Sequence, residues 1–483
     1  MNQTYSQARQ LKDKSFDGQF LFAVKTTGIF CRPSCPSPIA KEDNVIYFEQ
    51  VYEALEQGFR PCHRCRPDLV LEPISTQVPG AFRVQKALDK IHEGYLNYHS
   101  IQELAQSVFV SERQLRKLFV KHLGVAPIKI AKYHKALFAK KLVVFSRQSL
   151  TEIAFASGFN SIRQFNSVFK EIFGDSPSAI RATLLENRSA EGSVLLLKYD
   201  PSFHFKSVLS FLRPRAIKGV EQVTEEAYYR TFHTEEACGF LKITDCRAQS
   251  ALQLQIQTDD IRCYMMIYNQ VRKLFDLDMD FSKVTRRFKE DALLKKGLEK
   301  GQVPRLPVAF NAFEFVVRAI IGQQVSVKAA STLAARLVEK ADLKTDGHFP
   351  DGLRYFFPPP EVLLDLELEG MGLSQSKQLT IQEVSKAVVM KKLQLTANQS
   401  FEAFYQAFSS IKGIGDWTIN YVAMRALGMK DCFPASDLGI IKALTQILGQ
   451  KPHLKEIQQL AEQWHPYRAY AALCLWNQYN PKN

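Results

Sequence analysis

The chain has 483 residues, a length that excludes a single compact core and predicts about three or four domains. With 46% hydrophobic and 23% charged residues, its composition excludes wholesale disorder. The formal net charge of +14 favours a polyanion as partner, either nucleic acid or an anionic membrane surface.

The sequence gives no support for a membrane or secreted location. No stretch approaches the ~18–20 consecutive apolar residues that cross a bilayer, and the first ten residues lack the apolar core of a signal peptide. We therefore expect a cytoplasmic protein. Five of its nine cysteines are scattered and typical of ordinary packing, namely Cys238, Cys246, Cys263, Cys432 and Cys474.

The other four cysteines form two close pairs, Cys31 with Cys35 and Cys62 with Cys65. Each pair can occupy a tight turn, and two such turns can meet as a tetrahedral thiolate site for Zn²⁺. Two alternatives stay open at this point. The cysteines could be buried free thiols, or they could bind a zinc ion that only holds the fold together.

The residues around these cysteines carry a specific resemblance. Segments 26–35 and 58–68 closely resemble the N-terminal domain of the Ada family of alkylation-response proteins, over about residues 1–75. The resemblance implies a small α+β domain with one four-cysteine Zn²⁺, in which Cys31 accepts a methyl group from a DNA methylphosphotriester. Methylation would remove one negative charge from the site and so strengthen DNA binding. Residues 61–64 also match the active-cysteine motif of alkylguanine methyltransferases, but we reject that interpretation because Cys62 belongs to the zinc set.

Residues 70–80 contain two prolines and a glycine and predict a linker. A helical stretch is expected from about Ala81 to Arg188. It holds two similar units, one beginning at Ser100 with a capping-box partner at Glu103, the other beginning at Ser149. Two such units joined by a long helix resemble the all-α DNA-binding domain of AraC-type regulators, which implies promoter DNA and RNA polymerase as partners.

A strongly basic run crosses the first of these units. Ten Lys or Arg and no Asp or Glu occur between Arg113 and Arg147. Such a run is usually a solvated surface, but across a helix-turn-helix the neutralisation of phosphates is the better explanation. Two basic helix-turn-helix units make a membrane partner unnecessary, and we expect a nucleoid-associated protein. We expect recognition helices to begin near Ser111 and Ser161. The candidate groove contacts are Arg113, Gln114, Arg116, Arg163, Gln164 and Asn166.

The pattern changes in the second half of the chain. From about Ser193 to Asp280, short β-like runs alternate with helical segments and predict a small antiparallel α+β domain. Beyond Val308 the chain is expected to be helical to its end. The predicted strands lie at 194–199, 227–232, 240–244 and 251–256.

A glycine turn and an aspartate then indicate a DNA-acting enzyme. Gly413 and Gly415 predict a hairpin between two helices, where backbone N–H groups can approach a phosphate, although a plain helix cap would explain the glycines alone. Asp437 follows an apolar stretch with a proline, twenty residues after Trp417, and completes the helix-hairpin-helix glycosylase pattern. A simple helix N-cap at Asp437 is the alternative, and both can hold.

Residues from about 193 to 483, including Arg318–Val327, resemble the AlkA-type 3-methyladenine DNA glycosylases of the helix-hairpin-helix superfamily. The resemblance implies flipping of an alkylated purine and hydrolysis of its N-glycosidic bond, with Asp437 supporting an oxocarbenium-like sugar. Bifunctional members carry a Lys where this chain has Trp417, which predicts a glycosylase without lyase activity. The implied base-pocket residues, which as isolated aromatics would more often be core residues, are Trp417, Tyr421, Trp476 and Phe211.

The chain departs from this family at two positions. Gln324 stands where the best-known member inserts an apolar residue into the gap left by the flipped base, and Ser436 replaces a second acid beside Asp437. The family also implies an alkali ion held by hairpin carbonyls near Ser409, Ile411 and Ile414.

These observations predict four domains, at residues 1–75, 81–188, 193–305 and 306–483. The leading hypothesis is one chain that combines a methyl-accepting zinc domain, a transcription regulator and a glycosylase. The alternative is a regulator of the alkylation response whose C-terminal half only binds DNA.

Overall fold

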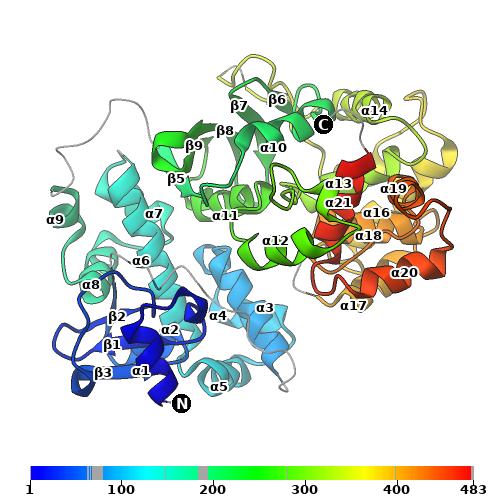
Figure 1. The fold of residues 1–483 in the computed structure, drawn as a ribbon. Helices are drawn as coiled ribbons and strands as arrows, with labels where there is room; N and C mark the ends of the chain where they lie inside the picture. Colours follow the sequence, from blue (N-terminus) through cyan, green and yellow to red (C-terminus); the bar gives the residue numbers. More distant parts are fainter. Residues whose placement is uncertain are drawn as a thin grey trace. The chain divides into compact units, whose positions relative to one another are not determined.

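The computed structural model describes residues 2–62, 65, 67, 80–146, 148–182, 194–279, 281–346, 348–396 and 399–479. The chain divides into two compact units, Met1–Ala190 and Glu191–Asn483 (Figure 1). Within the described ranges, no helix combines the length and the apolar character needed to cross a bilayer. Most of the predicted linker at 70–80, and the end of the helical stretch predicted to reach Arg188, lie outside the described residues.

The first unit begins with a small α+β part built on a four-stranded sheet of order β3-β1-β2-β4. Strand β1 pairs antiparallel with β2 and β3, while β2 pairs in parallel with β4. This parallel pairing sets two segments that are distant in sequence side by side. The elements are α1 (Asn2–Gln10), β1 (Leu21–Val24), β2 (Ile29–Cys31), β3 (Val45–Phe48), α2 (Val51–Glu56) and β4 (Arg60–Pro61).

The rest of the first unit is all helical and contains the two predicted helix-turn-helix repeats. Ser100 and Ser149 begin α4 and α7 with capping boxes to Glu103 and Glu152, so both predicted helix starts are confirmed. The long α6 joins the repeats. The helices are α3 (Ala81–His92), α4 (Ile101–Ser107), α5 (Glu112–Leu123), α6 (Pro127–Phe145), α7 (Leu150–Ala156), α8 (Ile162–Phe173) and α9 (Pro177–Ala182).

One lysine of the predicted basic run links the two repeats from within. Lys135 lies on α6, and its Nζ donates to the carbonyl oxygens of Leu96, at 3.0 Å, and Gly158, at 2.6 Å. Burial lowers the pKa of Lys135 to about 8. Lys135 is therefore a structural residue of the bundle and not one of the run's phosphate contacts.

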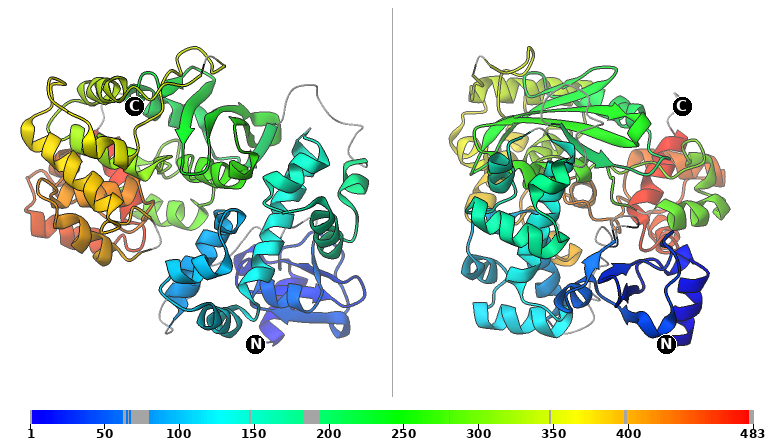
Figure 2. Two further views of the ribbon diagram at one scale, coloured as in Figure 1. Left: turned by 180° about the vertical axis from the view of Figure 1, so that it is seen from behind. Right: turned by 90° about the vertical axis from the view of Figure 1, so that its left-hand side faces the viewer.

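The second unit opens with a five-stranded antiparallel sheet of order β5-β9-β8-β7-β6, seen as a broad twisted sheet in Figure 2. The four predicted strands are confirmed, and a short fifth one, β6, was missed because its three residues include two polar ones. The strands are β5 (Val194–Lys198), β6 (Glu221–Val223), β7 (Ala227–His233), β8 (Cys238–Cys246) and β9 (Ala251–Thr258).

Two helices, α10 (Phe205–Leu212) and α11 (Tyr264–Leu274), pack against this sheet. Phe275, which follows α11, lies 5.5 Å from Phe205 of α10 and 6.3 Å from Tyr228 of β7, measured between ring centroids. These contacts fix α10, and with it the following segment 213–217, relative to the sheet.

The remainder of the second unit is helical and shares one hydrophobic core with the start of the sheet region, through Ile217 and Val220. The predicted multidomain fold class is confirmed. The helices are α12 (Phe281–Glu290), α13 (Ala312–Ile321), α14 (Val327–Ala341), α15 (Pro360–Asp365), α16 (Gln375–Val389), α17 (Phe401–Ser409), α18 (Asp416–Arg425), α19 (Leu438–Leu448), α20 (Leu454–Glu462) and α21 (Arg468–Tyr479).

A buried ionic network joins the sheet to the helices of the second unit. Arg230 of β7 donates to Glu314 of α13 at 2.7 Å. Arg318, one turn further along α13, donates to Glu221 of β6 and to Glu314, at 3.0 Å each. Burial alone would raise the pKa of Glu221, but Arg318 and Arg230 outweigh burial and hold that pKa below its ordinary value.

The same network fixes the segment between α10 and β6. Arg318 also donates to the carbonyl oxygen of Arg215, and Glu221 accepts the backbone N–H of Ile217 at 3.0 Å. Segment 213–217 is thus tied both to β6 and to α13.

We predict that Arg230→Met destabilises the second unit by about 3–5 kcal/mol, because it leaves the two buried carboxylates of Glu221 and Glu314 sharing the single charge of Arg318. The side chains of Arg230, Glu221 and Glu314 are only 3%, 5% and 4% exposed. Denaturant unfolding followed through the tryptophans, all three of which lie in this unit, measures the change. A loss below about 1 kcal/mol would contradict the assignment of a buried, structure-forming network.

Candidate functional site

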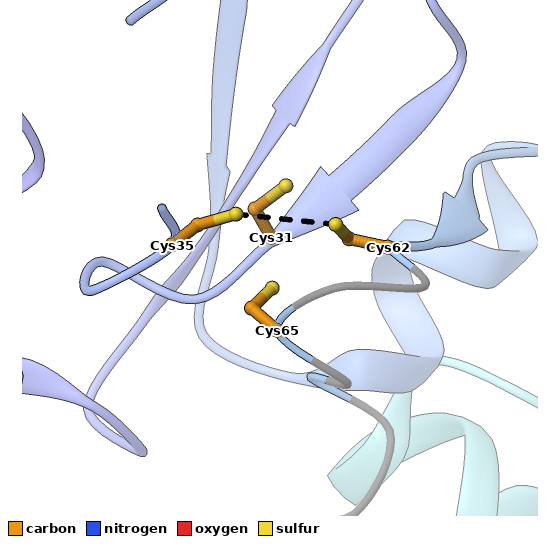
Figure 3. Close-up of side chains that lie close together, drawn as sticks. All are labelled: Cys31, Cys35, Cys62 and Cys65. Carbon is orange, nitrogen blue, oxygen red and sulfur yellow. Dashed lines mark hydrogen bonds between the residues drawn. The ribbon is translucent and has the colours of Figure 1, made fainter. Parts of the chain in front are cut away.

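The four clustered cysteines converge in the first unit (Figure 3). Cys31 ends β2 and Cys62 follows β4, so the parallel pairing of Phe30 with Pro61 brings the two cysteine pairs together. The Sγ atoms of Cys35 and Cys62 are 3.9 Å apart, and all four Sγ atoms lie within 4.8 Å of one another. Tetrahedral ligation with Zn–S bonds of about 2.3 Å requires S···S separations near 3.8 Å. The side chains therefore fit one Zn²⁺.

Contacts around the cysteines hold the loop that joins the first pair. The backbone N–H of Arg32 donates to the Sγ of Cys65 at 3.4 Å, and Asp17 accepts the N–H of Ser34 at 3.0 Å. All four cysteine residues are at most 6% exposed. The convergence of all four Sγ atoms within 4.8 Å favours one metal site over the alternative of four buried free thiols.

The two candidate recognition helices, α5 and α8, begin as predicted at Ser111 and Ser161, whose hydroxyl groups cap the N–H groups of Gln114 and Gln164. The six candidate groove residues are all exposed, and Arg116 pairs with Glu112 at 2.6 Å. Their positions in the two repeats correspond, with Arg113 and Gln114 in the first turn of α5 and Arg163 and Gln164 in the first turn of α8. Their contacts to DNA stay a prediction.

The hairpin between α17 and α18 depends on Gly413. This glycine has φ +92°, and an added Cβ would lie 2.2 Å from the Oγ1 of Thr380 on α16. That hydroxyl donates to the carbonyl oxygen of Lys412 at 3.0 Å, and Gln323 donates to the carbonyl oxygen of Gly413 at 3.1 Å. Gly415, the N-cap of α18, faces open space. No sequence pattern points to Thr380, whereas Gln323 lies inside the segment 318–327 that resembles the AlkA-type glycosylases.

Gln324 lies at the turn between α13 and α14, with an exposed side chain and a left-handed backbone, φ +58°. Lys377 of α16 holds this turn by donating to the carbonyl oxygens of Ile321, at 2.9 Å, and Gln323, at 2.7 Å. An exposed side chain on a turn held by hydrogen bonds is suited to fill the gap that a flipped base leaves in the duplex. That role stays a prediction, as does the alkali ion expected near Ser409, Ile411 and Ile414.

Asp437 is the N-cap of α19, and its carboxylate has four hydrogen-bond donors. Oδ1 accepts the backbone N–H groups of Gly439, at 2.8 Å, and Ile440, at 3.1 Å. The indole Nε1–H groups of Trp476 and Trp417 donate to Oδ1 at 2.7 Å and to Oδ2 at 2.8 Å. The N-cap alternative is thus correct, and it fixes the carboxylate that lines a cavity.

That cavity has a volume of about 620 Å³, and all five residues predicted for the catalytic site and base pocket line it, namely Asp437, Trp417, Tyr421, Trp476 and Phe211. Trp417 and Tyr421, one turn apart on α18, stack with their ring centroids 4.9 Å apart. The Trp476 ring lies edge-on to Tyr421 at 6.2 Å. The aromatic residues form a π-rich wall beside the carboxylate.

Two arginines that sequence analysis missed line the same cavity, Arg215 and Arg425. Arg425 continues the α18 stripe of Trp417 and Tyr421 by one further turn, a spacing that could have shown it. Arg425 is 4% exposed, and this burial lowers the pKa of its guanidinium to about 10. The Cζ atoms of Arg215 and Arg425 lie 4.0 Å and 4.4 Å from the centroid of the Phe211 ring.

Comparison with known protein families assigns each part of the chain. Residues 4–68 match the metal-binding domain of Ada, and residues 104–183 match a helix-turn-helix domain. Residues 194–311 match the AlkA N-terminal domain, and residues 317–466 match the HhH-GPD superfamily of base excision DNA repair proteins.

One relative spans nearly the whole chain. A probable bifunctional transcriptional activator/DNA repair enzyme AlkA of Mycobacterium tuberculosis is 33% identical over 477 residues, 97% of this chain and 95% of that protein. The chain belongs to this family of Ada/AlkA-type bifunctional activators and repair enzymes. Its predicted DNA partner, its single Zn²⁺ site and its DNA glycosylase class are thereby confirmed.

Two further relatives cover the second unit. DNA-3-methyladenine glycosylase 2 of Escherichia coli is 29% identical over 283 residues, 58% of this chain and 95% of that protein. The solved structure of a 3-methyladenine DNA glycosylase from Archaeoglobus fulgidus superimposes with a TM-score of 0.50 at 22% identity. It covers 58% of this chain and 96% of that one, a likeness in fold.

We predict that Gly413→Ala weakens both the stability of the hairpin and the affinity for duplex DNA, because the new Cβ would meet Thr380 from a left-handed backbone. The expected loss of stability is about 1–3 kcal/mol. Gly415→Ala is the matched control for stability, since its φ of −104° suits any residue and its Cβ would meet nothing within 4 Å. Thermal unfolding compares the two variants, and DNA titration measures the affinity of Gly413→Ala against the wild type. Equal losses of stability in the two variants would refute the role of the Gly413 conformation.

Proposed function

We propose that the second unit is a monofunctional DNA glycosylase that releases alkylated purines such as 3-methyladenine from duplex DNA. The observation that carries this proposal is the position of Asp437, a carboxylate held by two indole N–H groups at the wall of an aromatic cavity. The names of the relatives support the same substrate class.

The cavity suits a base flipped out of the helix. The rings of Trp417 and Tyr421 offer a stacking surface, which attracts a cationic, N-alkylated purine more strongly than a normal one. The C1′–N bond breaks heterolytically and leaves its electron pair on the base, which departs neutral. Asp437 then faces the oxocarbenium-like sugar, and water adds at C1′ with loss of a proton.

Asp437 is suited to this electrostatic role because three of its four donors bind Oδ1, while Oδ2 accepts only from Trp417 among the described residues. Oδ2 therefore keeps acceptor capacity for the developing positive charge. No lysine occurs among the described residues that line the cavity, which supports hydrolysis without a Schiff-base lyase step.

We further propose that Cys31 accepts a methyl group once, as an alkylation sensor, and that the helix-turn-helix repeats then bind promoter DNA and recruit RNA polymerase. The candidate base-edge contacts are the six exposed residues of α5 and α8 already described. Since chromosomal DNA is the partner, we propose a cytoplasmic location on the nucleoid. The division at residues 1–75, 81–188, 193–305 and 306–483 assigns one domain to each function.

The competing function is a regulator whose second unit only binds DNA. A module that only binds DNA requires the hairpin. It does not require a carboxylate that four hydrogen-bond donors hold at the wall of a cavity. The Asp437 arrangement therefore favours the enzyme.

We predict that Asp437→Asn lowers release of 3-methyladenine by at least ~100-fold, because the side chain loses the charge that opposes the sugar cation. Asn is an equally good N-cap through its amide oxygen, so the cap of α19 is retained, while the amide NH2 that replaces Oδ2 no longer accepts from Trp417. Single-turnover base release from alkylated duplex DNA measures the effect, and the wild type should leave no strand break before alkali treatment. Ser436→Ala, at the exposed neighbouring position, is the control and should be unaffected.

The two halves of this experiment fail separately. Unchanged base release in Asp437→Asn would remove Asp437 from catalysis and revive the binding-only alternative. Strand breaks formed by the wild type without alkali would refute the monofunctional assignment.

We predict that the full chain, mixed with DNA containing a methylphosphotriester, gains one methyl group on Cys31 and keeps its zinc. Peptide mapping by mass spectrometry locates the adduct, and metal analysis counts the ion. The transfer breaks the O–CH₃ bond and forms an S–CH₃ bond, leaving a phosphodiester anion. A methyl group on Cys35, Cys62 or Cys65, or none, would show that the zinc ion has only a structural role or that another sulfur is the acceptor.

A further inference from the structure

A segment of the cysteine-bearing part of the first unit lies against the ends of both candidate recognition helices. This segment, residues 51–61, runs from α2 through β4. Glu53 of α2 faces Gly124, the C-cap of α5, where an added Cβ would lie 3.5 Å from the Cγ of Glu53. Arg60 of β4 faces Gly174, the C-cap of α8, where an added Cβ would lie 2.1 Å from the Nη1 of Arg60. Because Gly124 and Gly174 occupy corresponding positions in the two repeats, segment 51–61 meets both repeats at the same place.

Arg60 also makes a direct hydrogen bond to the second recognition helix. Its Nη1 donates to the carbonyl oxygen of Phe173, the last residue of α8, at 3.1 Å. The last carbonyl groups of a helix have no partner within the helix and carry partial negative charge, so a guanidinium stabilises the helix end. The ring of Phe173 is buried and packs on Phe169 with the centroids 4.7 Å apart. Arg60 therefore contacts α8 where that helix joins the core of the second repeat.

The same arginine is fixed to the four-cysteine site through the backbone of β4. The N–H of Arg60 donates to the carbonyl oxygen of Gly28 at 2.7 Å. Two residues further on, the N–H of Cys62 donates to the carbonyl oxygen of Phe30 at 2.9 Å. Phe30 directly precedes Cys31, so the two bonds tie β4 to the strand that ends in the proposed methyl acceptor. Arg60 is thus attached to the metal site by its backbone and to α8 by its side chain.

We propose that Arg60 is a positioning residue that relays the state of the four-cysteine site to α8, so that methylation of Cys31 fixes the second recognition helix. This inference rests on the proposed sensor function and adds a route by which the sensor reaches the DNA-binding repeats. The route is a contact within the chain, separate from any change in how the zinc domain itself meets the DNA backbone.

Charge supplies the difference between the two states of the sensor. Four thiolates on Zn²⁺ leave the site with a net negative charge, and methyl transfer, which breaks an O–CH₃ bond and forms an S–CH₃ bond, removes one unit of it. The guanidinium of Arg60 is attracted both by this site and by the carbonyl end of α8. Loss of one negative charge weakens the first attraction, so the guanidinium binds the helix end more firmly. A contact that differs between two states is the requirement for a conformational switch.

The test measures hydrogen exchange in the last turns of α8 in the full chain. Exchange is compared before and after methyl transfer from a duplex that carries a methylphosphotriester, with the DNA then removed. In the wild type we expect methylation to slow this exchange about fivefold or more, the lower end of typical coupling between two sites. In Arg60→Met the change should be less than about twofold, because methionine offers the helix end no charge and no donor. Arg60→Lys keeps a cation and should retain part of the response.

A pair of glycine variants separates this contact from a general loss of stability. Gly174 and Gly124 have φ of +83° and +73°, so a Cβ strains the cap of either helix alike. Only Gly174→Ala also displaces the guanidinium of Arg60, whereas the Cβ of Gly124→Ala meets Glu53 at an ordinary contact distance. We expect Gly174→Ala to lose the exchange response of α8 and Gly124→Ala to keep it. The same response in both variants would overturn the inference.

DNA binding supplies a functional readout. The probe is the duplex that the methylated wild type selects from a random-sequence pool, titrated with the methylated and the unmethylated protein. Arg60→Met should reduce the gain in affinity that methylation brings by about fivefold or more. An equal loss of affinity in both forms would make Arg60 a phosphate contact instead and overturn the inference.

The remaining outcomes separate this inference from the function on which it rests. A wild type that gains the methyl group on Cys31 without any change in α8, or an Arg60→Met variant that responds like the wild type, would overturn the inference and leave the proposed sensor intact. An Arg60→Met variant that no longer holds zinc would show that Arg60 only maintains the zinc domain, which also overturns the inference. A wild type that gains no methyl group on Cys31 would refute the proposed sensor itself, together with this inference.

Discussion

The second unit depends on a group of buried charges that satisfy one another. Glu221 and Glu314 share Arg230 and Arg318 across the junction between the sheet and α13, and Arg318 also holds the backbone at Arg215. Because a buried ion that loses its partner is costly, this group has one favourable arrangement. That arrangement sets the segment after Phe211, from the sheet region, into the cavity wall that Trp417 and Trp476 supply from the helices.

Within that wall, Asp437 caps a helix and is also the group that opposes the sugar cation in the function that we propose. Asp437 caps α19 through its Oδ1, and the same contacts stop the carboxylate from rotating. The indole donors of Trp417 and Trp476 add direction without adding positive charge, so the carboxylate keeps its full negative charge toward the cavity. A lysine or arginine in their place would have neutralised the group that is to oppose a sugar cation.

Local rules predicted the elements well, and non-local contacts explain what was missed. Capping serines, the glycine hairpin and the alternating strands are short-range patterns, and each was found. The basic run between Arg113 and Arg147 includes Lys135, and the sequence cannot show that the amine of this residue donates to the carbonyl oxygens of Leu96 and Gly158 instead. The sequence does not single out Arg425, because it shows neither that the residue is buried nor that no carboxylate of the described residues pairs with it.

The distribution of charge between the two units matches two different demands on DNA binding. Residues 1–190 carry 26 basic against 17 acidic residues, and exposed arginines stand at the starts of both recognition helices. The second unit has a smaller excess, and the contact with DNA that we predict there is the hairpin of backbone groups around Gly413. A regulator benefits from long residence, which many phosphate contacts provide, whereas an enzyme has to leave its product. Backbone N–H donors carry no net charge, so they can position a DNA strand with fewer ionic contacts than lysines and arginines would make. Fewer ionic contacts allow the product to dissociate.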